Sequence, residues 1–150
     1  MQISEMNEQD CLQFLETRHL GRLGCCRDNH PYVVPVHYAI EGALIYGFSM
    51  PGQKTEWLAA NPNACIQVDD LKGQGSWHSV LVEGHYTALP DTPGFHNERI
   101  HAWELLKRRE MWWEPGSSKI EHLGSGIDAS PVFFSISADR VTGRQALPET

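Results

Sequence analysis

Apolar and polar residues alternate with a period of two in several stretches of the chain, and this pattern predicts β-strands. The clearest stretch runs from Tyr32 to Ile40, where every second side chain is Tyr, Val or Ile. We expect this apolar face to point into the core. The opposite face carries Val33, Pro35 and His37, and we place His37 away from the core or at its margin.

Pro35 is unusual inside a predicted strand, because a proline cannot donate a ladder hydrogen bond. It predicts a sheet edge, a bulge or interrupted pairing at this point. Glu41-Gly42 provides a tight hairpin turn, and a second strand is predicted from Ala43 to Ser49. Tyr32 to Ser49 therefore reads as a β-hairpin.

The rest of the chain adds short strands and a few helices. Helices are predicted over 7–18, 54–60 and 97–112, and strands over 20–26, 64–70, 77–88 and 131–141, followed by a polar tail. Many short strands with turns between them predict a mainly β (α+β) fold, an antiparallel barrel or sandwich with helices covering its ends. We expect one domain over residues 1–150.

The charge and hydrophobicity of the chain argue against some functional classes. The net charge is −7 and the pI is near 5.5, which argues against a nucleic-acid partner. The first residues are polar and acidic, and no apolar run reaches the length of a membrane span. We therefore expect a cytoplasmic protein with reduced cysteines and no membrane partner.

The loop after the second strand is a candidate anion site. Ser49, Gly52 and Lys54 surround the start of a short predicted helix, where backbone N–H groups and the helix dipole favour negative charge. Gln53 stands between Gly52 and Lys54 and breaks the register of a nucleotide-binding P-loop. A single-phosphate site and a plain turn with a surface lysine are equally good interpretations of this loop by itself.

The sequence gives less support to a metal site or to hydrolytic catalysis. The eight histidines show no metal-ligand spacing, so no metal site is expected. No nucleophile elbow is present, and no residue stands out as a catalytic acid or base. The adjacent Trp112 and Trp113 cannot both face one core, and we favour a subunit contact for one of them over ligand stacking.

Five segments taken together resemble a known family. They are LGRLGCC at 20–26, PYVVPVHY at 31–38, LIYGFSMPGQK at 44–54, NPNACIQVD at 61–69 and WHSVLVEG at 77–84. Their order and spacing are similar to those of the pyridoxamine 5′-phosphate oxidase-related FMN-binding proteins, especially the branch with nitroimidazole-resistance flavoproteins. The resemblance implies a split β-barrel homodimer with FMN at the subunit interface.

The resemblance also implies roles for individual residues. The flavin ring would lie along the backbone of Pro35–His37, the 49–54 loop would hold the phosphate, and Trp77 and Ser79 would reach the ribityl–phosphate side. The complete set of implied cofactor-binding residues is Pro35, Val36, His37, Phe48, Ser49, Gly52, Gln53, Lys54, Trp77 and Ser79.

The chain departs from true pyridoxamine-phosphate oxidases after Arg144, where their basic and histidine-bearing substrate segment is not found. We therefore expect an FMN-dependent oxidoreductase that uses NAD(P)H or another donor to reduce a small molecule such as a nitro or quinone compound. A non-catalytic flavin- or haem-binding module is the alternative. A deazaflavin enzyme is less attractive, because its acidic cofactor tail needs a basic groove.

Overall fold

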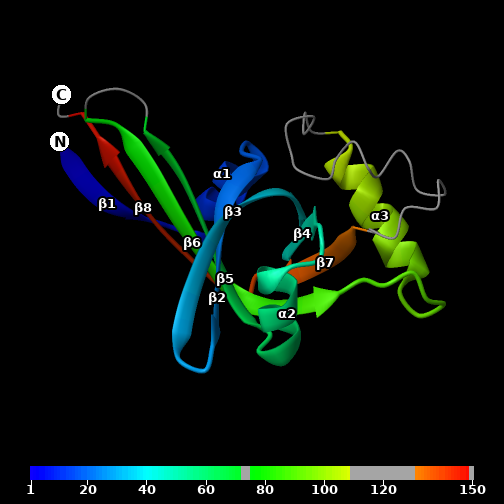
Figure 1. Ribbon diagram of the computed structural model, residues 1–150. Helices are drawn as coiled ribbons and strands as arrows, with labels where there is room; N and C mark the ends of the chain where they lie inside the picture. Colours follow the sequence, from blue (N-terminus) through cyan, green and yellow to red (C-terminus); the bar gives the residue numbers. More distant parts are fainter. Residues whose placement is uncertain (72–74, 109–130, 149–150) are drawn as a thin grey trace.

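The computed structural model describes residues 1–71, 75–108 and 131–148 (Figure 1). These residues form strands and three helices. The strands are β1 (Gln2–Met6), β2 (Leu20–Arg27), β3 (His30–Glu41), β4 (Leu44–Ser49), β5 (Asn63–Leu71), β6 (Trp77–Ala88), β7 (Val132–Ser137) and β8 (Arg140–Leu147). The helices are α1 (Glu8–Glu16), α2 (Gln53–Ala60) and α3 (His96–Leu106).

Six of the strands close into an antiparallel barrel in the order β2, β3, β4, β7, β6 and β5. This confirms the predicted mainly β fold with helices around an antiparallel barrel. β8 and then β1 continue the sheet from β6 outside the barrel. In Figure 1 these two strands and the first half of β6 extend together away from α3.

β6 changes partner halfway along its length, and this change closes the barrel. Residues Trp77 to Glu83 pair with β8, whereas Tyr86 to Ala88 pair with β7. Gly84 lies at the change, and a Cβ atom there would overlap the carbonyl oxygen of Ser137. Only glycine lets the two strands approach this closely.

The barrel interior is the main core, and it contains the predicted apolar face of β3. Val36 and Tyr38 are buried there with residues such as Leu23, Ile66 and Val82 from neighbouring strands. The Tyr38 hydroxyl donates a hydrogen bond to the Leu15 carbonyl oxygen at 2.7 Å and so ties α1 to the barrel.

α3 covers the side of the barrel formed by β3, β4 and β7, and builds a second apolar cluster there. Phe48 packs against Phe133 and Trp103, and Ala102 and Leu106 of α3 are fully buried. Within the described parts of the chain, no helix has both the length and the apolar character needed to cross a bilayer.

Two strand predictions were wrong. β1 was not predicted, and the single strand over 131–141 is two strands, β7 and β8, separated by a turn at Ala138 and Asp139. The tail that reads as polar is the second half of β8. Only Ala146 of that strand is buried, so the strand is held by pairing with β6 and β1 and carries little apolar signal. Trp112 and Trp113 lie outside the described residues.

Candidate functional site

β3 and β4 separate at the pair Tyr38–Gly47, and this separation is the split in the barrel wall. From Tyr38 to Glu41 the two strands form a regular ladder. Before Tyr38, β3 continues along β2, whereas after Gly47, β4 continues along β7. Residues 30–37 of β3 therefore have a strand neighbour on one side only among the described residues.

Pro35 lies on this open edge without disturbing the β2–β3 ladder. The Tyr38 amide donates to the His19 carbonyl oxygen at 3.0 Å. Tyr38 and His19 therefore form a hydrogen-bonded pair of the ladder. Opposed pairs alternate along an antiparallel ladder, so the pair Arg22–Pro35 is non-hydrogen-bonded. The backbone groups of Val33 and Pro35 consequently point away from β2, toward the open side. Of the predicted interpretations of Pro35, the sheet edge is confirmed.

His37 lies on the same face of β3 as Pro35, away from the barrel interior, as predicted, and it is buried there, with 4% of its surface exposed. β3 pairs with β2 as far as His37 and with β4 from Tyr38 to Glu41, and Ala39 packs in the apolar cluster beneath α3. The ring stacks on His19 with 5.7 Å between centroids. Burial, assisted by the nearby His19, lowers the pKa of His37 below its usual 6.5. The imidazole at the split is therefore neutral at pH 7.

Ser49 ends β4 at the other side of the split, opposite Val132 of β7. The residue is 3% exposed. Its hydroxyl has no hydrogen-bond partner among the described residues. A buried unpaired hydroxyl is unfavourable and uncommon in folded proteins. This atom is thus a hydrogen-bonding group ready for a ligand.

The predicted phosphate loop, which begins at Ser49, continues to the start of α2 at Gln53. Gly52 caps α2: its amide donates to the Thr55 hydroxyl, which donates in turn to the Gly52 carbonyl oxygen, at 3.0 and 2.9 Å. A Cβ at Gly52 would meet no atom closer than 3.9 Å. The backbone here is therefore open to approach, and the first-turn amides of Gln53 and Lys54 face the helix N-terminus.

Lys54 lies in the first turn of α2, a helix that contacts β2. Its ammonium charge lowers the pKa of the Cys25 thiol, against the larger effect of burial, which raises it. Phe48 differs from the other predicted ligands, because its side chain is buried under α3. Only the Phe48 backbone lies at the split.

Trp77 and Ser79 belong to a different part of the sheet. The pairing register places Pro35, Arg22, Gln67 and Leu81 in one row across β3, β2, β5 and β6. Side chains of such a row share the face that points away from the barrel core, which we call the outer face. Three strand spacings, about 14 Å, separate β3 from β6 along this row.

The sequence did not reveal a polar network on the outer face. Gln67 donates to Asp69 at 3.0 Å and to the Ser79 hydroxyl at 3.1 Å. Arg22 reaches both Gln67 and Asp69, at 3.4 and 3.3 Å. These contacts join β2, β5 and β6, which are far apart in the chain. The only sequence signal was the alternation of polar residues along β5.

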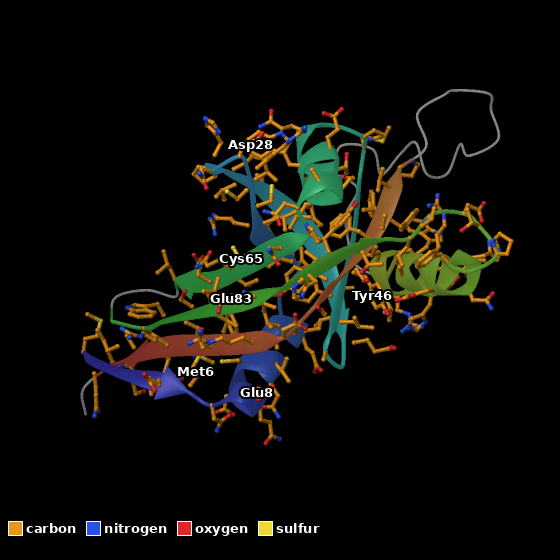
Figure 2. All side chains as sticks on the ribbon, turned by 90° about the horizontal axis from the view of Figure 1, so that it is seen from below. Met6, Glu8, Asp28, Tyr46, Cys65 and Glu83 are labelled. Carbon is orange, nitrogen blue, oxygen red and sulfur yellow. The ribbon has the colours of Figure 1, made fainter. Side chains whose placement is uncertain are left out.

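Two grooves open on the outer face. One, of about 610 Å³, is lined by residues of β2, β3, β5 and β6, including Cys26, Val33 and Cys65. Figure 2 shows Cys65 and Glu83 on the neighbouring strands β5 and β6, where they are paired. The other groove, of about 620 Å³, includes Trp77 and Ser79. Among the described residues, no three His, Cys, Asp or Glu side chains are arranged to hold a metal ion.

Comparison with known proteins places the chain in a family. The family model described as pyridoxamine 5′-phosphate oxidase matches residues 7–145. The chain belongs to the pyridoxamine 5′-phosphate oxidase family. This confirms the resemblance read from the five sequence segments. An uncharacterized protein of Rhizobium meliloti (strain 1021) is 44% identical over 147 residues, covering 97% of each chain.

Solved structures share the fold of this chain. The crystal structure of a FAD-binding protein from Mesorhizobium loti is 40% identical, covers 99% of each chain and superposes with a TM-score of 0.79. A protein of Bacteroides thetaiotaomicron named for 5-nitroimidazole antibiotic resistance has a TM-score of 0.68 at 19% identity, covering 97% of this chain and 90% of its own. At that identity, the likeness shows a common fold only.

Proposed function

We propose that this protein binds a flavin, through an FMN moiety, at the split between β3 and β4. The observation that carries the proposal is the Ser49 hydroxyl, which is buried at the split without a partner among the described residues. Family membership and the FAD-binding relative from Mesorhizobium loti support the same cofactor class. The flavin supplies electron transfer, and the chain binds and orients it.

The residues at the split suit the two ends of such a ligand. The backbone groups of Pro35 and His37 lie at non-hydrogen-bonded positions of the β2–β3 ladder and can face a flat ring on the open side. Val36 lies between them, with its backbone paired to Gly21 and its side chain in the core. Ser49 donates to the phosphate, while the first-turn amides of α2 and the Lys54 ammonium balance its charge. Because His37 is neutral, it adds no positive charge at the ring side, whereas Lys54 adds one at the phosphate end.

We further propose that the site is completed in a homodimer. Trp77 and Ser79 are about 14 Å from β3 within one chain, which is too far for them to share the ring edge with Pro35. The outer face that carries them exposes apolar side chains, with Val33 64% and Leu71 78% exposed. Burial of this face against a second copy would remove these side chains from water and bring Trp77 and Ser79 to the cofactor of the partner.

The proposed reaction is the reduction of a small molecule, such as a nitro or quinone compound, with electrons from NAD(P)H. Among the described residues, His37 at the split is a poor proton donor, because burial lowers its pKa. The role of the chain is therefore to hold the flavin and to limit water at the ring.

One spectroscopic experiment tests the proposal. The purified protein, or the protein mixed with FMN, is expected to show a flavin band near about 450 nm with a protein-induced shift. Anaerobic addition of NAD(P)H then bleaches the band if the protein is an oxidoreductase, and leaves it unchanged if the protein is a non-catalytic flavin-binding module. Absence of any bound flavin contradicts the proposal. Light scattering tests the dimer, with an expected mass twice the 16.9 kDa of one chain.

A further inference from the structure

The turn that leads into α2 is closed by a side chain that none of the proposed flavin contacts uses. The Thr55 hydroxyl accepts a hydrogen bond from the Gly52 amide at 3.0 Å and donates one to the Gly52 carbonyl oxygen at 2.9 Å. The Glu56 amide donates to the same carbonyl oxygen at 3.0 Å. A single hydroxyl therefore binds both backbone groups of Gly52 and fixes the direction in which α2 begins.

These hydrogen bonds decide which groups of the turn remain for a ligand. The Gly52 amide is occupied by Thr55, so it does not donate to a phosphate while the turn is closed. A threonine hydroxyl has one proton, and Thr55 uses it on the Gly52 carbonyl oxygen. The remaining donors are the first-turn amides of Gln53, Lys54 and Thr55, which have no acceptor within a helix. Thr55 can therefore act on a phosphate only through the backbone that it holds.

Two observations indicate that this turn borders a ligand site and is more than a helix cap. Ser49, whose buried hydroxyl has no partner among the described residues, ends β4 three residues before Gly52. The space beside Gly52 is open, because a Cβ atom there would meet nothing closer than the Met50 carbonyl oxygen at 3.9 Å. An anion that accepts from the Ser49 hydroxyl therefore has the start of α2 nearby.

We propose that Thr55 is a positioning residue for the flavin phosphate. The inference rests on the proposed flavin function. The two hydrogen bonds of Thr55 hold the first-turn amides of α2 in one direction, so that the phosphate meets donors that are already arranged. Without the hydroxyl, the turn has to be ordered when the ligand binds, and this ordering weakens the binding. The effect acts on the phosphate and leaves the contacts of the flavin ring unchanged.

Parallel titrations with FMN and riboflavin test the proposal, because riboflavin has the same ring and ribityl chain without the phosphate. Thr55→Val keeps the shape of the side chain and removes the hydroxyl. It is expected to bind FMN at least about fivefold more weakly than the wild type, the change that loss of one helix cap predicts, and to bind riboflavin equally well. Thr55→Ser keeps the hydroxyl and is expected to bind FMN like the wild type.

Thr17→Val is the matched control. The Thr17 hydroxyl donates to the Phe14 carbonyl oxygen at 2.7 Å, at the C-terminal end of α1. This variant is expected to have a lower melting temperature, as Thr55→Val has, and to bind both ligands like the wild type.

Three results overturn the inference alone: equal losses of FMN and riboflavin affinity in Thr55→Val, no loss of FMN affinity in that variant, or an equal loss in Thr55→Ser. A wild-type protein that binds neither ligand contradicts the proposed function itself, and this inference with it.

Discussion

Pro35 stands opposite Arg22 at a non-hydrogen-bonded position of the β2–β3 ladder, three residues before the hydrogen-bonded pair of Tyr38 and His19. Its missing N–H therefore removes no bond from the barrel. The same geometry turns the carbonyl of Pro35 toward the open side of β3. A residue that reads as a strand breaker is tolerated here because it lies where the barrel wall is split.

This geometry predicts different effects for two substitutions on β3. Pro35→Ala is expected to change the free energy of unfolding by less than about 1 kcal/mol, since no ladder hydrogen bond is gained or lost. Val36→Pro is the matched test: Val36 opposes Gly21 at a hydrogen-bonded position, and we expect a loss of at least about 2 kcal/mol. Urea unfolding measures both, and a harmless Val36→Pro would show that the assigned register is wrong.

Ser49→Ala is expected to have opposite effects on folding and on ligand binding. Removal of a buried hydroxyl without a partner leaves the flavin-free protein equally stable or up to about 1 kcal/mol more stable. Flavin binding weakens by about 0.5–1.5 kcal/mol, because one hydrogen bond to the ligand is lost. Thermal unfolding and FMN titration separate the two effects.

Ser137→Ala is the control, because its hydroxyl already accepts the His85 amide at 3.1 Å. This variant is expected to lose stability and to keep its flavin affinity. If Ser49→Ala behaves in the same way, the Ser49 hydroxyl has a structural partner and no ligand role.

His37 predicts a pH dependence of stability. Its pKa in the folded protein lies below 6.5, whereas an exposed histidine in the unfolded chain titrates near that value. As the pH falls through 6.5, the unfolded chain therefore binds more protons than the folded one, and stability decreases until the pH is below the folded pKa. His37→Gln lacks this term. Its unfolding free energy should change less than that of the wild type between about pH 7.5 and pH 5.5, as measured by urea unfolding. An identical change in both proteins would show that His37 does not have a lowered pKa.

The close approach of β6 and β7 at Gly84 predicts that a side chain at this position destabilises the barrel. Gly84→Ala places a Cβ on the Ser137 carbonyl, so β6 and β7 must move apart, at a cost of about 3 kcal/mol or more. Gly94→Ala, where a Cβ would meet no atom within 4 Å, is the control and is expected to be neutral. Thermal unfolding of both variants is the measurement, and equal melting temperatures would contradict the closure described here.

The sequence predicted the parts of the fold that bury an alternating apolar face. The hairpin from Tyr32 to Ser49 and the helix capped by Asn7, whose side chain accepts the Asp10 amide, are both confirmed. β1 and β8 were missed because strand pairing, β8 with β6 and β1 with β8, holds them and burial contributes little. Their residues are mostly exposed and carry no strong pattern.

Only part of the candidate site could be predicted from the sequence. Ser49 and Lys54 follow a hairpin and precede a helix, and that local order indicates an anion loop. The network that links Arg22 to Asp69 depends on the pairing of β2 with β5, two strands separated by more than 30 residues. The distance between Pro35 and Trp77 depends on strand order as well, and no local pattern encodes it.

We propose that a flavin is held at the split by the phosphate end of the site. The most direct test is titration of flavin-free protein with FMN, followed by fluorescence, for the wild type and Lys54→Ala. We expect saturable binding by the wild type and a loss of about 1.5–3 kcal/mol in the variant, because one charge-assisted phosphate contact is removed. Unchanged FMN affinity in a Lys54→Ala protein with the wild-type circular dichroism spectrum, or no binding by the wild type, would contradict the claim.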